Sequence, residues 1–94
     1  MNSKQRATLA AVFRRPSPAS IRWTDIEGLL KAVGCTLVEG AGSRVTFTKD
    51  GVVASFHRPH PEKEAKRYQV RDAAAYLDKL GLGPAHDAGK ENDE

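Results

Sequence analysis

The stretch RVTFTKDGVVASFH, residues 44–57, decides the fold. Each half alternates apolar and polar side chains, which is the period of a β-strand that buries one face. The apolar set is Val45, Phe47, Val52, Ala54 and Phe56. Asp50-Gly51, between the halves, is typical of a two-residue type I′ turn, which needs a positive φ at both positions. The stretch therefore predicts a β-hairpin that turns an apolar face to the core and leaves a more polar face exposed.

The segment before the hairpin predicts two helices and a short strand. Lys4–Arg15 carries an apolar stripe at i, i+3 and i+4 and stops at a proline-rich linker. The second helix is expected to start at a capping box, in which the Thr24 hydroxyl would bond the Glu27 amide. Gly34 is its natural stop, and Cys35–Val38 then predicts a short strand with Cys35 as a small buried residue.

Beyond the hairpin, prolines keep the chain extended before a last helix. That helix is expected to run from Tyr68 or Gln69 to Leu80, with Gly81 as its stop. The inward stripes of the second and last helices are Ile26, Leu29, Leu30, Val33, Val70, Ala73, Ala74 and Leu77. The order α-α-β-β-β-α predicts an α+β two-layer sandwich, in which a three-stranded antiparallel sheet packs against helices on one face.

Length and charge divide the chain into three parts. The 94 residues suit one domain. We expect an N-terminal helix and linker over 1–20, the domain itself over 21–82, and a disordered acidic tail over 83–94. Residues 1–83 carry 14 Lys and Arg against 8 Asp and Glu, although the whole chain is only +3. This basic body favours a polyanionic partner, and a solvated surface of mixed charge is the alternative.

Composition also excludes several classes of protein and site. No apolar run approaches the ~20 residues that a membrane span needs, and the first residues lack the apolar core of a secretory signal. A single cysteine excludes an internal disulfide and a Cys-rich zinc site. His57 and His60 are spaced as zinc ligands could be, but prolines make their segment extended. We therefore expect a cytoplasmic protein with no cofactor, no metal and no membrane contact.

Cationic and titratable residues gather in the hairpin and just after it, at Arg44, Lys49, His57, Arg58, His60, Lys63, Lys66 and Arg67. In metal-free RNA cleavage the 2′-hydroxyl is the nucleophile, so the protein supplies a base, an acid and a group that stabilises the phosphate. The candidate catalytic residues are His57 as the base, His60 as a second proton-transfer group and Arg44 on the phosphate. His86 lies in the tail and is expected to be inert.

Several motifs stand in a distinctive order and spacing over roughly residues 21–82: Leu29–Cys35, Glu39–Phe47, Phe56–Glu64 and Leu80–Leu82. Together they resemble the HicA toxins of bacterial HicA–HicB toxin–antitoxin pairs. The resemblance implies a fold similar to double-stranded-RNA-binding domains. It also implies a metal-independent mRNA interferase, that is, an endoribonuclease that inhibits translation and is neutralised by a HicB antitoxin. The helix over Lys4–Arg15 is an addition to the shortest family pattern.

The sequence departs from the family at one important position. The family motif is Gly-Ser-His, with the histidine taken as catalytic, but here Gly42-Ser43 is followed by Arg44. Arginine stays protonated and is a poor general base. Either Arg44 holds the phosphate while His57 or His60 moves protons, or the chain is a weak or silent RNA- or antitoxin-binding module. The candidate RNA-binding residues are Ser43, Arg44, Lys49, Arg58, Lys63, Lys66 and Arg67.

The expected partners are mRNA and a HicB-like antitoxin, with oligomers formed only through the antitoxin complex. We expect an acidic antitoxin to mask the basic sheet face near Arg44, Arg58 and Lys63, because complementary charge speeds capture. A protein-interaction domain without a nucleic-acid role is a third interpretation, and the basic body disfavours it.

Overall fold

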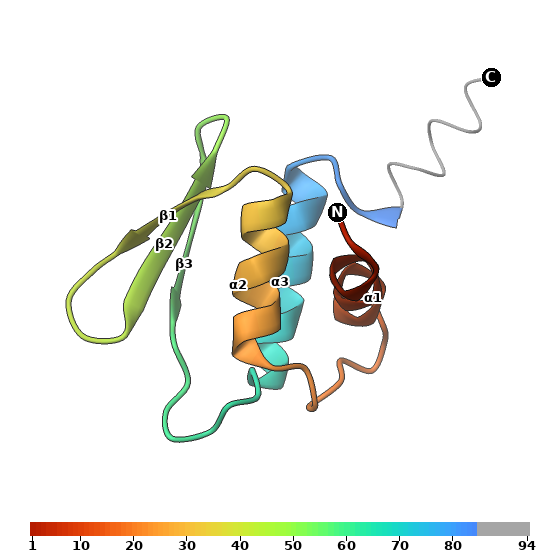
Figure 1. The fold of residues 1–94 in the computed structure, drawn as a ribbon, viewed down its shortest axis with the longest axis horizontal. Helices are drawn as coiled ribbons and strands as arrows, with labels where there is room; N and C mark the ends of the chain where they lie inside the picture. Colours follow the sequence, from red (N-terminus) through yellow and green to blue (C-terminus); the bar gives the residue numbers. More distant parts are fainter. Residues whose placement is uncertain (85–94) are drawn as a thin grey trace.

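Three helices and three strands follow one another in the expected order. The computed structural model describes residues 1–84 (Figure 1). The elements are α1 (Ser3–Val12), α2 (Trp23–Ala32), β1 (Thr36–Glu39), β2 (Arg44–Lys49), β3 (Val52–His57) and α3 (Arg67–Lys79). The α+β class and the element order are confirmed. Of the predicted acidic tail over 83–94, the structure describes only Gly83, which is buried, and Pro84; residues 85–94, which include His86, lie outside the described residues.

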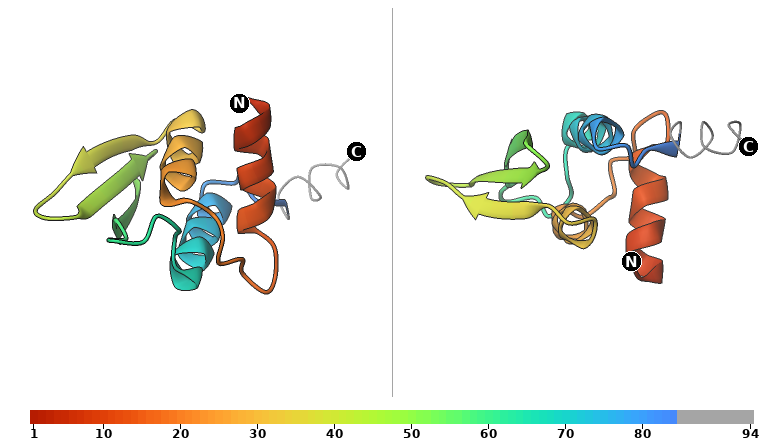
Figure 2. Two further views of the ribbon diagram at one scale, coloured as in Figure 1. Left: turned by 60° about the horizontal axis from the view of Figure 1, so that its bottom comes forward. Right: turned by 90° about the horizontal axis from the view of Figure 1, so that it is seen from above.

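The sheet packs on one side of α2 and α3, and α1 lies on the other side of those two helices (Figures 1 and 2). The predicted packing of the sheet against helices on one face is confirmed, and α1 packs on the side of α2 and α3 that faces away from the sheet. Val12 of α1 is fully buried there. The face of the sheet that points away from the helices consequently carries no element of the described chain (Figure 2).

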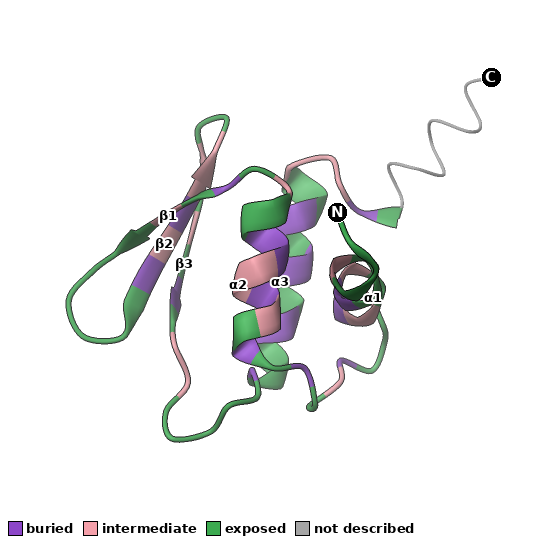
Figure 3. Ribbon diagram, in the orientation of Figure 1, coloured by how far each residue is buried: buried purple, intermediate pink, exposed green. Residues whose placement is uncertain are grey.

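The strand order is β1-β2-β3, and both pairings are antiparallel. Asp50 and Gly51 have φ values of 52° and 80°, as the predicted turn requires. Val45, Phe47 and Phe56 are buried between sheet and helices, which confirms the alternation of the hairpin (Figure 3). The residues that alternate with them along β2 and β3 consequently line the opposite, open face.

The core joins the sheet to α2 and α3 through aromatic and aliphatic side chains. The Phe56 ring packs at centroid distances of 5.2 Å from Trp23 and 5.9 Å from Phe47. The fully buried side chains beneath them include Ile26, Leu29, Leu30, Val70 and Leu77. Cys35 is buried as expected, and burial raises the pKa of its thiol.

The start of α2 differs from the prediction. The helix begins at Trp23, and its N-cap residue Arg22 makes no side-chain capping bond, so the Thr24–Glu27 capping box is wrong. The reason is a long-range partner, because the Trp23 N–H donates to the Lys63 carbonyl at 2.9 Å. The Glu27 carboxylate accepts from the Trp23 indole N–H and from Arg58 instead of capping the helix.

The predicted stop of α2 at Gly34 is confirmed. The Gly34 N–H donates to the Lys31 carbonyl and the Cys35 N–H to the Leu30 carbonyl, both at 3.0 Å. These two bonds form a Schellman motif, and Gly34 has the φ of 105° that favours glycine there. The other boundaries shift by one to three residues, which is the usual uncertainty at element ends.

Candidate active site and nucleic-acid surface

Arg44 and His57 are register partners on β2 and β3, at the end of the hairpin away from its turn. Both are exposed on the open face of the sheet. Facing residues of an antiparallel pair have Cβ atoms about 4.5–5.5 Å apart, so both side chains can reach one bound group. The structure therefore brings together a permanent cation and a titratable imidazole, as the sequence predicted.

Ser43 completes this cluster from the loop before β2. Its Oγ lies 3.4 Å from Nδ1 of His57. When Nδ1–H donates to the hydroxyl, Nε2 carries the free lone pair of the neutral imidazole and can accept a proton. Ser43 can thus fix the tautomer that a histidine base at Nε2 would need.

The open face continues from this cluster as a row of small side chains. The hydroxyls of Thr46 and Ser55 lie 3.0 Å apart across the two strands. Val38 and Val53 flank them and are 56% and 58% exposed. A macromolecule lying on this face would meet polar and apolar surface beside the Arg44–His57 pair.

The backbone of His57 is held from two sides. The Arg58 N–H donates to the Ser43 carbonyl at 2.9 Å, which ties the end of β3 to the loop before β2. The Gln69 side-chain amide donates to the His57 carbonyl at 2.7 Å, while its Oε1 accepts the Lys66 N–H at 3.0 Å. Gln69 is only 2% exposed. These bonds fix the place from which the imidazole projects.

Sequence reasoning missed Gln69 as a residue that positions the site. A signal was present, because Gln69 lies four residues before Ala73 on the buried stripe of α3, where a polar side chain needs a partner. The identity of that partner, a carbonyl twelve residues earlier, depends on the tertiary fold.

Arg58 serves the fold more than the surface. Its Nε and Nη2 donate to the Glu27 carboxylate at 2.6 and 3.2 Å, and its Nη1 donates to Glu39 at 2.9 Å. Burial raises the pKa of Glu27, but the bonds from Arg58 and the Trp23 indole outweigh it, so that pKa lies below its usual value. The pKa of Arg58 is raised by the same carboxylates. Arg58 thus joins α2 and β1 to the segment after β3.

The remaining candidate cations do not converge on Arg44. Lys49 lies at the turn end of β2, with Nζ 4.0 Å from the Asp50 carboxylate. At ~3.3 Å per residue it is about 17 Å along the strand from Arg44. Lys66 and Arg67 are exposed at the start of α3.

His60 and Lys63 border a separate cavity, close to the end of β3. Its volume is about 380 Å³, and its lining includes Arg22, Trp23, Arg58, Pro59, His60 and Lys63. The structure thus divides the predicted site residues into the Ser43–Arg44–His57 cluster, this neighbouring cavity, and outlying cations. Over residues 1–84, no group of three or more His, Cys, Asp or Glu side chains is arranged as a metal site.

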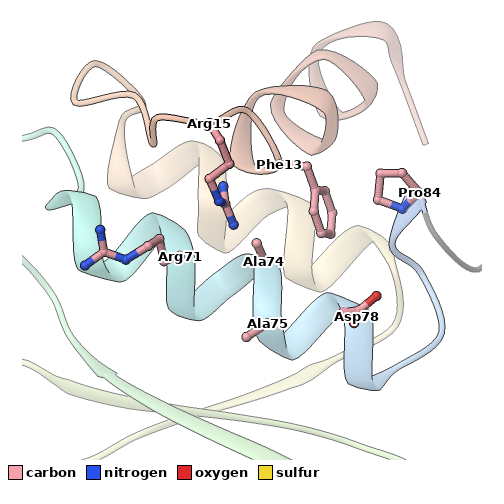
Figure 4. A pocket seen from close by; sticks show the side chains of 7 residues that line it. All are labelled: Phe13, Arg15, Arg71, Ala74, Ala75, Asp78 and Pro84. Atoms are coloured by element: carbon pink, nitrogen blue, oxygen red, sulfur yellow. The ribbon is translucent and has the colours of Figure 1, made fainter.

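A second cavity of about 380 Å³ lies between α1 and α3, away from the sheet (Figure 4). Phe13, Arg15, Arg71 and Asp78 are among the residues that line it. It contains none of the predicted site residues and lies on the far side of α3 from the open face (Figure 4).

The fold and site define a small α+β domain whose open sheet face carries a paired cation and imidazole. The model of a known family, described as HicA toxin of bacterial toxin–antitoxin, matches residues 23–82. This match covers more than half of the chain, so the chain belongs to the HicA toxin family. It is therefore a toxin of a toxin–antitoxin system, and the family implies an antitoxin as its partner.

The family match begins at the first residue of α2 and ends three residues after α3. Helix α1 thus lies outside it. No curated protein and no solved structure matches the chain. Within the described part of the chain, every helix is too short or too polar to cross a membrane.

Proposed function

We propose that this toxin is a metal-independent endoribonuclease that binds mRNA on its open sheet face, cleaves it and so inhibits translation in the cytoplasm. The observation that carries the proposal is the pairing of Arg44 with His57 across β2 and β3. An exposed arginine can bind a phosphate, and an adjacent imidazole can transfer a proton near neutral pH.

In the proposed mechanism His57 Nε2 removes the proton of a 2′-hydroxyl. The 2′-oxygen attacks the adjacent phosphorus, and the bond to the 5′-oxygen of the next nucleotide breaks. Arg44 stabilises the added negative charge of the phosphorane, which forms and decays beside it. The leaving 5′-oxygen takes a proton, for which His60 is the candidate donor, and the products end in a 2′,3′-cyclic phosphate and a 5′-hydroxyl.

The test uses purified toxin and synthetic single-stranded RNA in the presence of EDTA. We expect cleavage with 2′,3′-cyclic phosphate ends, identified by mass spectrometry, and no cleavage at a position whose nucleotide is replaced by its 2′-deoxy form. His57→Ala should lose activity, and His86→Ala serves as a matched histidine control. Cleavage that requires a divalent cation or leaves a 5′-phosphate would refute the mechanism.

A second candidate function rests on Arg44 itself. Because this residue stands where the family motif has its histidine and cannot act as a base, the chain can instead be a silent module that binds RNA or the antitoxin. RNA binding by the wild-type toxin without any product, even after long incubation, would favour this function over the nuclease.

A further inference from the structure

We propose that the cavity between the start of α2 and the segment after β3 binds one nucleotide of the RNA, next to the scissile phosphate. In this subsite Pro59 and Pro61 contact the base, beside the buried Trp23 that also lines the cavity, and Arg22 and Lys63 bind its phosphate. The inference deepens the proposed nuclease function and rests on it for the position of the nucleotide relative to the cleaved bond.

Backbone pairing builds the cavity walls into the fold. Trp23 N–H donates to the Lys63 carbonyl at 2.9 Å, and Ala65 N–H donates to the Ile21 carbonyl at 2.8 Å. Arg22 and Glu64 form an isolated antiparallel bridge between these bonds. Arg22 and Lys63 are therefore carried by two paired segments. Because these two segments are already fixed, a ligand that binds there loses little affinity to the conformational entropy of ordering them.

The part of the cavity lining that follows β3 is held in place by Arg58, the residue between His57 and Pro59. Its guanidinium is bound by the carboxylates of Glu27 and Glu39. The indole N–H of Trp23 donates to the same Glu27 carboxylate. One ion-pair network therefore holds the aromatic residue and the proline segment on either side of the cavity.

The lining has the chemistry that a nucleotide needs. Pro59 and Pro61 supply accessible apolar surface against which a base can pack, whereas Trp23 lines the cavity while being only 4% exposed. Arg22 and Lys63 supply two positive charges, and no carboxylate of residues 1–84 forms an ion pair with either. Glu62 adds one negative charge to the lining, which leaves the pair of cations in excess.

The size and position of the cavity also favour a nucleotide over a single acidic side chain of a protein partner. Its volume of about 380 Å³ lies within the roughly 300–1,000 Å³ of small-molecule sites, and a carboxylate alone would leave most of it empty. Pro59 is two residues from His57, so their Cα atoms are at most about 7.6 Å apart. A nucleotide bound here would follow directly from the Arg44–His57 pair.

The test exploits Trp23, which is the single tryptophan of the chain. Adenosine and uridine monophosphate are titrated into the full-length toxin while its tryptophan emission is followed, with inorganic phosphate as a separate titration. We expect a saturable change with at least one nucleotide and none with phosphate at the same concentrations. The double variant Arg22→Gln/Lys63→Gln should raise the dissociation constant at least tenfold.

Lys31→Gln/Lys79→Gln is the matched control, because it removes two exposed lysines from the last turns of α2 and α3. Binding unchanged in the Arg22/Lys63 variant, or equal response to inorganic phosphate, would overturn the subsite. If the Arg22→Gln/Lys63→Gln variant binds nucleotide normally but binds the antitoxin more weakly, the assignment of these two cations to the nucleotide is overturned. The cations would then bind the protein partner.

His57→Ala separates this inference from the nuclease proposal. We expect this variant to bind mononucleotide normally while it fails to cleave RNA. A wild-type toxin that binds nucleotide but never cleaves RNA would refute the nuclease and leave the cavity as a nucleotide site. A toxin that cleaves RNA but does not bind nucleotide through Arg22 and Lys63 would refute the subsite alone.

Discussion

The side-chain amide of Gln69 on α3 donates a hydrogen bond of 2.7 Å to the backbone carbonyl of His57 at the end of β3. The last helix thus holds the residue that we propose as the base. Because Gln69 is nearly fully buried, its side-chain amide has little access to water as a substitute partner.

Replacement of Gln69 by Leu is expected to lower the free energy of unfolding by about 1–3 kcal/mol, because it leaves the His57 carbonyl and the Lys66 N–H without their side-chain partner. Urea denaturation followed by circular dichroism measures the change. Arg71→Leu, on the exposed side of the same helix, is the control and should shift stability by less than about 0.5 kcal/mol. Equal midpoints for the Gln69 and Arg71 variants would contradict a positioning role for Gln69.

Loss of the imidazole at position 57 is expected to abolish toxicity without unfolding the protein. Removal of a general base usually costs ~10²–10⁴ in rate. Growth and mRNA integrity after induced expression of His57→Ala give the measurement, and circular dichroism verifies the fold. His60→Ala is the comparison variant, because its side chain is also exposed near the end of β3. Loss of toxicity in His60→Ala alone would transfer the role of the base to His60.

Acid is expected to weaken the Arg58–Glu27 pair. The pKa of Glu27 lies below its ordinary value of 4.5 in the folded protein, so the unfolded chain takes up the proton first as the pH falls. The stabilisation is complete above pH 4.5 and is lost as the pH drops through the lowered pKa. Urea midpoints from pH 7 downward should therefore fall less steeply in Glu27→Gln than in the wild type. Parallel curves would show that Glu27 does not carry this dependence.

Antitoxin affinity is expected to depend on cations of the open face and its margin. Arg44→Glu/Lys63→Glu should weaken binding at least tenfold and slow association, since an acidic partner is steered by opposite charge. Surface plasmon resonance at two salt concentrations measures both effects, with Lys31→Glu/Lys79→Glu as the charge-matched control. Arg58→Glu is unsuitable for this purpose, because it would face Glu27 and Glu39 with a like charge. An unchanged affinity in the Arg44/Lys63 variant would refute the docking face.

The hairpin could be predicted from sequence because strand period and turn chemistry are local properties. Val45, Phe47 and the Asp50-Gly51 turn are sufficient to set the register, and that register brings Arg44 to His57. The stop of α2 at Gly34 is equally local, since a positive φ there needs glycine.

The features that sequence reasoning missed depend on partners distant in the chain. Helix α2 starts at Trp23, whose backbone N–H donates a hydrogen bond to the carbonyl of Lys63. No local sequence pattern predicts that bond. The sequence around Arg58 predicts a surface cation, because nothing near it in the chain indicates the ion pairs with Glu27 and Glu39. Long-range pairing therefore decides which charges are available to a ligand.

Helix α1 lies behind α2 and α3, and the N-terminus emerges on that side of the molecule (Figure 1). A tag or tether attached at Met1 therefore leaves from the side opposite the sheet. Toxin immobilised through its N-terminus should present the open face to solution, whereas coupling through random surface lysines would block a fraction of the molecules. This geometry makes the N-terminal anchor the appropriate format for testing whether RNA and the antitoxin compete for the open face.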